Sequence, residues 1–250
     1  MRSIRDNRPG GGNDREGAAP IRLQLLGGFS VTVDGEPVDV APSAQRFLAG
    51  IALLGGSANR THLAETLWPD SPSKRGLANL RSAVWRMPDN VREGIEKVGL
   101  VVRLDHRWSI DLDTAAREAL GLRTGTRPEA IDRSLFGNDL LPDWDEHWLI
   151  IRRERHRQLR LHALEDLAAA QITEGRALDA VDSALEAVLA EPLRESAQLL
   201  LVRAHIAAGN RCAALDQFER FRELLHAELD VEPGDELQAL VATARGQRRH

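Results

Sequence analysis

The stretch from residue 74 to residue 87 carries the most informative alternation of apolar and polar positions in the chain. Placed on a helix of 3.6 residues per turn, its apolar side chains form one stripe: Leu77, Leu80, Val84 and Met87. The opposite face holds a polar set: Arg75, Asn79, Ser82 and Arg86. Pro88 ends the helix. One face therefore predicts a buried contact, and the other presents two guanidinium groups, an amide and a hydroxyl.

Those polar groups match the guanine edges, adenine edges and phosphates that line a DNA major groove. Arg81 and Trp85 flank the apolar stripe, and we expect Lys74 and Arg81 to contact phosphates. From residue 74 to residue 92 there are five basic side chains and one acid, Asp89. Taken alone, the basic face fits a solvated surface as well as a nucleic-acid interface.

The segments around this helix predict its context. Apolar alternation over 21–26 and 29–33, a turn at Asp34-Gly35 and resumption at 38–40 predict a small antiparallel sheet. Apolar faces then predict helices over 42–54 and 59–67. After Pro88, alternation at 98–102 and 108–112 around Asp105-His106 predicts a second hairpin. The order of sheet, three helices and hairpin is that of a winged helix, with helix 74–87 as the reading helix.

Two further groups of DNA-binding candidates follow from this arrangement. Asn59, Arg60 and Thr61 stand at a predicted helix N-terminus, where backbone N–H groups suit a phosphate. Arg103 and Arg107 are candidates on the hairpin, whose tip we expect at residues 103–107. We expect Trp68 to be a packing residue, and Trp85 to pack beside the apolar stripe, against the hairpin.

The second half of the chain has a helical pattern with an internal repeat. Short helices are predicted over 113–122 and 128–136, and a long helix over 145–174 whose apolar positions include Ile151. Gly175 and Gly209 lie 34 residues apart, and apolar pairs recur at the same offset, including Leu167 with Leu201 and Ala180 with Ala214. This period is that of tetratricopeptide repeats, and 234–244 would be the capping helix. The fold class is therefore mainly α with a small β component.

Composition limits the classes of function. The 250 residues carry a formal charge of -5, so positive charge for a nucleic acid must be local. The single cysteine, Cys212, excludes an internal disulfide and a cysteine-rich zinc site, and we expect it to fill a small core position. No run is long and apolar enough to span a membrane, and residues 1–20 lack a signal peptide's apolar centre and predict a disordered tail. We therefore expect a cytoplasmic protein.

The motifs of common enzymes and cofactor sites are missing from the sequence. It contains no phosphate loop, no Gly-x-Gly-x-x-Gly after a strand and no His-Glu-x-x-His. His147, His156 and His162 share one predicted helix but do not converge on one face, so we expect structural histidines. We expect no catalytic residues, no metal and no cofactor.

Several separated segments of the first half resemble one family, the Streptomyces antibiotic regulatory protein (SARP) family. The segments are Leu25-Leu26-Gly27-Gly28-Phe29, Ser43-Ala44-Gln45-Arg46, Leu67-Trp68-Pro69-Asp70 and the run from Ala78 to Arg86. They resemble its N-terminal domain, an OmpR-type winged helix. The resemblance implies a DNA-binding domain over residues 21–112.

The second half resembles the bacterial transcriptional activator domain, which follows the winged helix in the SARP family. The segments that carry this resemblance include Leu141-Pro142-Asp143-Trp144, Glu191-Pro192-Leu193-Arg194 and the runs 157–165 and 204–210. The resemblance implies that residues 113–250 form this domain and that the protein activates transcription. It also implies binding to direct repeats in double-stranded DNA near promoter −35 elements, by protomers arranged head to tail as a homodimer on DNA. RNA polymerase, through its sigma and alpha subunits, is the implied protein partner.

One alternative remains open at this level: a protein-interaction scaffold that uses the helical repeats and has lost specific DNA binding. Residues 21–112 are nearly neutral, with eleven basic and ten acidic side chains, and Pro88 ends the reading helix early. A scaffold would tolerate loss of Arg75 and Arg86, whereas a DNA-binding protein would not.

Overall fold

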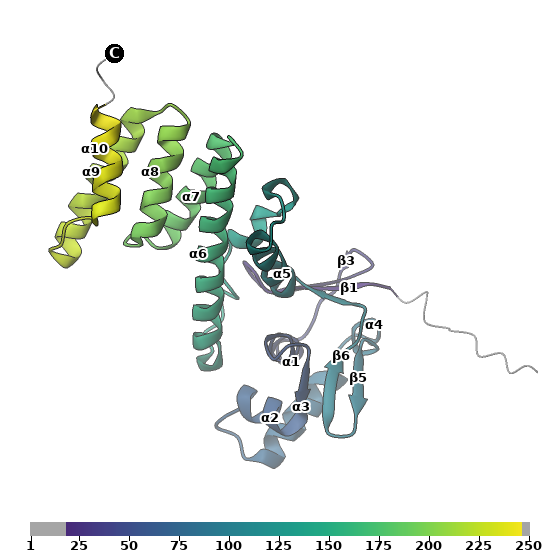
Figure 1. The fold of residues 1–250 in the computed structure, drawn as a ribbon. Helices are drawn as coiled ribbons and strands as arrows, with labels where there is room; N and C mark the ends of the chain where they lie inside the picture. The colour runs from purple at the N-terminus through teal and green to yellow at the C-terminus, as the bar shows by residue number, and fades with distance from the viewer. Residues whose placement is uncertain (1–18, 247–250) are drawn as a thin grey trace, which may run out of the picture. The chain divides into compact units, whose positions relative to one another are not determined.

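The computed structural model describes residues 19–246 and divides them into two compact units (Figure 1). Unit 1 holds residues 19–23 and 30–109; unit 2 holds residues 24–29 and 110–246. The expected tail, residues 1–20, lies almost wholly outside the described residues. The division differs from the expected domains 21–112 and 113–250 in two places, because a short early segment and residues 110–112 belong to unit 2.

Unit 1 begins with a four-stranded sheet. In the order of the sheet, its strands are β3 (Glu36–Pro37), β2 (Ser30–Val33), β1 (Ile21–Gln24) and β7 (Trp108–Ile110). Strands β2 and β3 pair antiparallel with Val33 opposite Glu36. Asp34 and Gly35 between them have φ of 53° and 83°, the left-handed pair that a two-residue hairpin turn requires. The expected hairpin at this turn is confirmed.

Four helices follow, beginning with α1 (Pro42–Leu53), whose Phe47, Leu48 and Ile51 are fully buried. The other helices are α2 (Arg60–Leu67), α3 (Ser73–Trp85) and the short α4 (Asp89–Arg92). Helices α2 and α3 approach closely at Gly76, where an added Cβ would lie 3.5 Å from the Cβ of Ala64. The expected apolar stripe of α3 packs inward, with Leu80, Val84 and Met87 buried and Leu77 half-buried. This arrangement leaves the polar face of α3 outward.

The wing is a three-stranded sheet, and its hairpin differs from the expected one. The strands lie in the order β4 (Ser57–Asn59), β6 (Val101–Leu104), β5 (Ile95–Val98). The hairpin joins β5 to β6, and its tip is Gly99-Leu100, with Gly99 at φ 59°. The expected tip at Asp105-His106 is wrong, because that turn leads into β7, which belongs to the other sheet.

Unit 2 joins two segments far apart in sequence. It opens with α5 (Asp111–Arg123), where the Asp111 carboxylate accepts hydrogen bonds from the backbone N–H groups of Leu25 and Leu26 at 2.8–3.0 Å. The same early segment places the Phe29 ring against Trp144, with centroids 5.8 Å apart. The two sequence motifs at 25–29 and 141–144 therefore lie in contact within one unit.

The helical repeat occupies the rest of unit 2. Three short 3-10 helices, Pro128–Ala130, Arg133–Phe136 and His147–Leu149, precede the long α6 (Ile150–Thr173). The following helices, which pack as neighbours (Figure 1), are α7 (Ala177–Ala190), α8 (Glu195–Ala207), α9 (Arg211–Leu229) and α10 (Asp235–Gly246). Helix α10 corresponds to the expected capping helix over 234–244.

The ends of α6 and α8 show the 34-residue period in their hydrogen bonds. Gly175 N donates to Ile172 O and Arg176 N to Gln171 O; Gly209 N donates to Ile206 O and Asn210 N to His205 O. Gly175 and Gly209 have φ of 76° and 74°, as this C-terminal cap requires. The predicted helix–turn–helix repeat is confirmed.

Two expectations about buried positions in unit 2 are wrong. Ile151 is 68% exposed, because α6 has 24 residues and α7 only 14, so that the first turns of α6 extend past its neighbours (Figure 1). Cys212 stands in the first turn of α9, where it is exposed and fills no core position.

Candidate nucleic-acid interface

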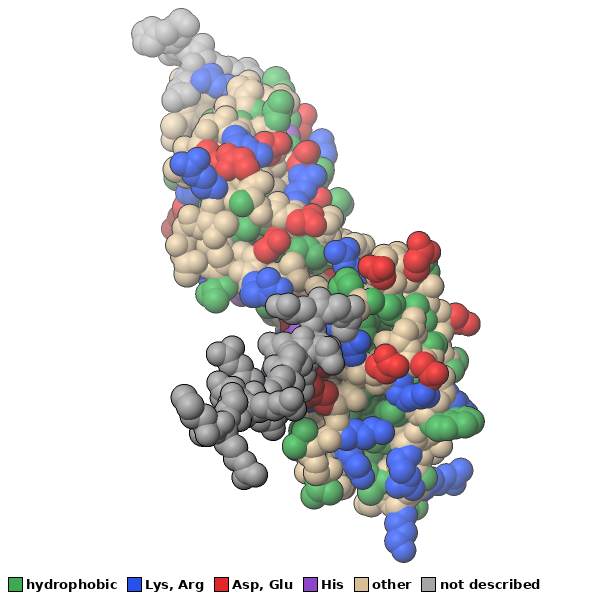
Figure 2. Space-filling model, turned by 90° about the vertical axis from the view of Figure 1, so that its right-hand side faces the viewer, with side chains coloured by type: hydrophobic (Ala, Val, Ile, Leu, Met, Phe, Trp, Pro, Cys, Tyr) green, Lys and Arg blue, Asp and Glu red, His purple; other side chains and the backbone are tan. Residues whose placement is uncertain are grey.

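The outward face of α3 gathers most of the predicted DNA-binding residues. Lys74, Arg75, Arg81, Ser82 and Arg86 are exposed, and Asn79 is half-buried. None of the four basic side chains forms an ion pair with another described residue. Figure 2 shows Lys and Arg side chains gathered over the end of unit 1 where Figure 1 places α2 and α3. Free cations on a helix are available for phosphates and guanine edges.

The N-terminus of α2 has less capacity for a phosphate than expected. The Asn59 side chain caps the helix, since its Oδ1 accepts a 2.9 Å hydrogen bond from Thr61 N. The Arg60 N–H donates to Leu100 O at 2.9 Å, which joins this helix end to the wing tip. Two of the backbone N–H groups thus already have partners, and a phosphate here would be held by the side chains of Arg60 and Thr61, both half-buried.

The two wing arginines are placed differently from each other. Arg103 lies exposed on β6 and pairs at 2.5 Å with Glu96 across the hairpin. The Arg107 side chain is only 13% exposed and its Nε donates to Asp105 at 2.8 Å. Since Arg107 lies after β6 rather than at the tip, the structure does not place it with the free cations of α3. His106 beside it is exposed.

The structure adds three residues that the sequence did not single out as DNA contacts. Trp85, at the end of α3, is 77% exposed and does not pack against the hairpin as expected. Lys97 is exposed on β5, and Arg92 of α4 lies beside it on a shared surface. These three residues line a hollow of about 520 Å³ together with Arg81, Ser82 and Val84, which we call the basic hollow.

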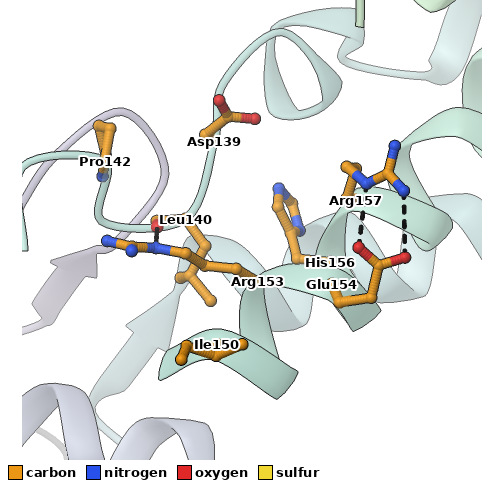
Figure 3. Close-up of a pocket in the computed structure, with 8 residues that line it drawn as sticks. All are labelled: Asp139, Leu140, Pro142, Ile150, Arg153, Glu154, His156 and Arg157. Carbon is orange, nitrogen blue, oxygen red and sulfur yellow. Dashed lines mark hydrogen bonds and ion pairs between the residues drawn. The ribbon is translucent and has the colours of Figure 1, made fainter. Parts of the chain in front are cut away.

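A second hollow, of about 610 Å³, lies in unit 2 between residues 139–142 and the first turns of α6 (Figure 3). Its charged groups already have partners: Arg153 donates to Leu140 O at 3.0 Å, and Arg157 pairs with Glu154 at 3.0 Å. His156 is 4% exposed, and its Nε2 donates to Asn138 O at 3.0 Å. Burial lowers the pKa of His156 and favours the neutral ring. The hollow is therefore part of the packing of this corner.

The described residues contain neither a cluster of three or more possible metal ligands nor a helix long and apolar enough to cross a membrane. His147 and His162 are exposed and His156 is buried, so the three histidines of this region do not converge.

Comparison with known proteins gives the family context of this surface. Residues 108–245 match the bacterial transcriptional activator domain family. The regulatory protein AfsR of Streptomyces coelicolor is 28% identical over 247 residues, which cover 93% of this chain and 25% of AfsR. The chain therefore spans about a quarter of the length of this relative. The transcriptional regulatory protein MoaR1 of Mycobacterium tuberculosis is 26% identical over 264 residues, 93% of this chain and 84% of MoaR1.

A solved structure supports the fold as a whole. Mycobacterium tuberculosis EmbR, in complex with a low affinity phosphopeptide, superposes with a TM-score of 0.70 at 22% identity, covering 93% of this chain and 66% of that chain. This likeness confirms the expected winged helix followed by a helical repeat. The named relatives are regulatory proteins rather than enzymes. Because this family match covers more than half of the 250 residues, the chain belongs to the family that carries the bacterial transcriptional activator domain, as its resemblance to the SARP family predicts.

Proposed function

We propose that the protein is cytoplasmic, binds specific sequences in double-stranded DNA and regulates transcription from the promoters that contain them. One observation carries this proposal: four unpaired cations lie with Ser82 and Asn79 on the outward face of α3, whose other face is packed into unit 1. In a winged helix this face enters the major groove. Arg75 and Arg86 would read guanines, Asn79 and Ser82 would orient on bases, and Lys74 would contact a phosphate.

The first experiment is selection of binding sites from a random or genomic DNA pool by the purified protein. Binding to the selected site would then be titrated against salt for the wild type and for Arg75→Ala with Arg86→Ala. We expect a repeated motif and its loss in the double variant, because each base-reading arginine contributes about 1–3 kcal/mol of discrimination. The spacing of the repeats would also show how many protomers bind.

Arg155→Ala is the matched control for this experiment. Arg155 is exposed on α6 in unit 2 and, like the α3 arginines, has no ion-pair partner among the described residues. Loss of one such charge should leave the selected motif unchanged. No enrichment at low salt, or equal binding by the wild type and the double variant, would contradict the proposal.

We propose further that the repeat of unit 2 contacts the transcription machinery and that the protein is an activator. The supporting observation is an apolar stripe on α7, where Leu178, Leu185 and Leu189 are 76%, 40% and 72% exposed at helical spacing. Exposed apolar stripes of this kind mark protein interfaces. By resemblance to the SARP family, the partners would be the sigma and alpha subunits of RNA polymerase.

The alternative of a scaffold without DNA binding would use the same stripe, so the two functions need separate variants. Leu178→Ser with Leu189→Ser should abolish transcription activation in a purified system while leaving DNA affinity unchanged. Loss of partner capture in this variant, together with a wild-type protein that selects no DNA motif, would favour the scaffold.

A further inference from the structure

The basic hollow is notable for its charge. Three of its six lining residues are cations, Arg81, Arg92 and Lys97, and none is a carboxylate. The remaining three are Ser82, Val84 and Trp85. A concave surface that combines three cations with a hydroxyl and no acid favours an anion. The apolar wall formed by Val84 and Trp85 favours an anion with an uncharged part beside it.

The three cations of the basic hollow differ in whether they already have partners within the protein. Arg92 pairs with Asp89, and its Nη1 donates to Trp85 O at 3.3 Å and Met87 O at 3.4 Å, so it holds the end of α3. Arg81 and Lys97 are exposed and have no ion pair with any other described residue. Arg92 therefore shapes the hollow, and Arg81 and Lys97 carry the charge that it offers to a ligand.

Trp85 is the least expected member of this set. Its 77% exposure leaves a large indole surface in water, which is costly unless a ligand covers it. The flat face of an indole can cover a sugar ring or a base, and its position one residue before Arg86 puts it at the edge of the reading face. The hollow is framed by α3, the proposed reading helix, and by β5, a strand of the neighbouring hairpin.

We propose that the basic hollow seats one phosphodiester of the DNA backbone, with Lys97 and Arg81 flanking the phosphate and Trp85 covering the adjoining deoxyribose. This assignment rests on the proposed DNA binding and adds a positioning site to it. Such a contact fixes the register of α3 in the groove but carries no sequence information of its own. It also gives the wing a role through Lys97 on β5, since Arg103 is engaged by Glu96.

The test pairs a protein variant with a DNA modification. Each phosphate of the selected site is replaced in turn by an uncharged methylphosphonate, and affinity is measured for the wild type and for Lys97→Ala. We expect one position at which the modification weakens wild-type binding by about two- to fivefold, the range of an exposed ion pair, yet has no further effect on Lys97→Ala. Lys97→Ala should also lower the magnitude of the salt slope by about 1.

Trp85→Ala provides the second arm. It should weaken binding to every sequence alike and leave the selected motif unchanged, whereas Arg75→Ala should change the motif. A changed motif in Trp85→Ala would show that Trp85 reads a base, and would contradict the proposed phosphodiester contact at the basic hollow. Both altered side chains are exposed, and urea unfolding of each variant should match the wild type.

The same chemistry could come from a free phosphate compound. Tryptophan fluorescence of the wild type is therefore titrated with inorganic phosphate and with thymidine monophosphate, and Trp85→Phe identifies the signal of Trp85. We expect no saturation by either compound at millimolar concentration and quenching by the DNA site. Saturable binding of the mononucleotide would overturn this inference while leaving DNA binding intact. The same holds if every methylphosphonate weakens binding equally in the wild type and in Lys97→Ala. A protein that selects no DNA motif would instead contradict the proposed function.

Discussion

Among single residues, Gly94 leaves very little room for a side chain. A Cβ added there would lie 2.5 Å from Trp108 Nε1 and 2.7 Å from Ile21 Cδ1. Trp108 Nε1 also donates a 2.8 Å hydrogen bond to Gly94 O, so the indole cannot move without losing that bond. We expect Gly94→Ala to lower the free energy of unfolding by about 1–3 kcal/mol, the usual cost of overpacking. Urea unfolding of the variant would measure it.

Gly76→Ala is the control for that substitution. Its added Cβ would meet Ala64 Cβ at 3.5 Å, an ordinary contact, and alanine favours the helix in which Gly76 stands. Its stability should equal or exceed that of the wild type. If Gly94→Ala behaves in the same way, the contact between Gly94 and Trp108 does not constrain the fold.

Which residues of α3 face outward could be predicted from the sequence, but what happens at its edges could not. Helical periodicity fixes the angle of each side chain around the axis, which places Arg75, Ser82 and Arg86 outward. Helical periodicity does not predict whether a neighbouring helix or strand packs against a side chain at the border between the apolar and polar faces. Trp85 is exposed and Arg107 is paired with Asp105 because of where β5 and β7 lie, and those positions are set by distant pairings.

Between secondary-structure elements, a largely buried ion pair joins α6 to the start of α8. Arg194 Nε and Nη2 donate to the two oxygens of Glu165 at 2.7 and 2.8 Å, and Ser196 Oγ donates to the same carboxylate. Burial alone would raise the pKa of Glu165, but the hydrogen bonds from Arg194 and Ser196 outweigh it and lower the pKa below the usual 4.5. The Glu165 side chain is only 12% exposed and the Arg194 side chain only 21% exposed.

This contact predicts a pH-dependent stability. Because the unfolded carboxylate takes up a proton at a higher pH than the folded one, the stabilisation is complete above about pH 4.5 and is lost as the pH falls through the folded pKa. Glu165→Gln should therefore lower the free energy of unfolding by about 1–3 kcal/mol at pH 7, and the difference should shrink in acid. Thermal unfolding from pH 3 to pH 7 would measure it, with the exposed Glu236→Gln, which loses a pair with Arg203, as control. A difference that stays constant with pH would contradict this role.

The repeats and the wing show which elements can be predicted locally. The cap bonds at Gly175 and Gly209 form within a single helix end, so a 34-residue offset in the sequence is enough to predict them. The wing requires a choice between sheets. Residues 95–98, 101–104 and 108–110 are all strands, but the last pairs with β1, far away in sequence. Alternation predicts that a strand forms and does not predict its partner.

For the whole molecule, the main unpredicted feature is that residues 24–29 belong to unit 2. Their alternation continues that of β1 and gives no sign of a change of unit. The bonds that hold them are long-range: Gly27 N donates to Asp139 O at 2.8 Å, and Leu141 N donates to Leu25 O at 2.9 Å. Fixing such contacts closes loops of more than 80 residues, and no local pattern encodes that closure.

Asp111 is the residue on which this long-range attachment depends most. Its carboxylate accepts from three backbone N–H groups, those of Leu25, Leu26 and Leu112, at 2.7–3.0 Å. Asp111→Ala leaves the first two donors without their acceptor, and we expect a loss of about 2–3 kcal/mol in the free energy of unfolding. Hydrogen exchange should show a local effect too, with the amides of Leu25 and Leu26 exchanging faster than in the wild type.

Asp113→Ala is the matched control, since Asp113 is a carboxylate in the same first turn of α5 but is exposed and holds neither of these amides. It should change neither the exchange at residues 25 and 26 nor the stability by more than about 0.5 kcal/mol. Equal exchange in Asp111→Ala and the wild type would contradict this role of Asp111. The backbone hydrogen bonds of Gly27 and Leu25, with the Phe29–Trp144 contact, would then be sufficient to hold residues 24–29 in unit 2. Exchange that is faster at residues 24–29 but unchanged for the amides of α6–α9 would show that the segment detaches from unit 2 while the repeat remains folded. We expect this result, because the repeat is stabilised by its own helix packing.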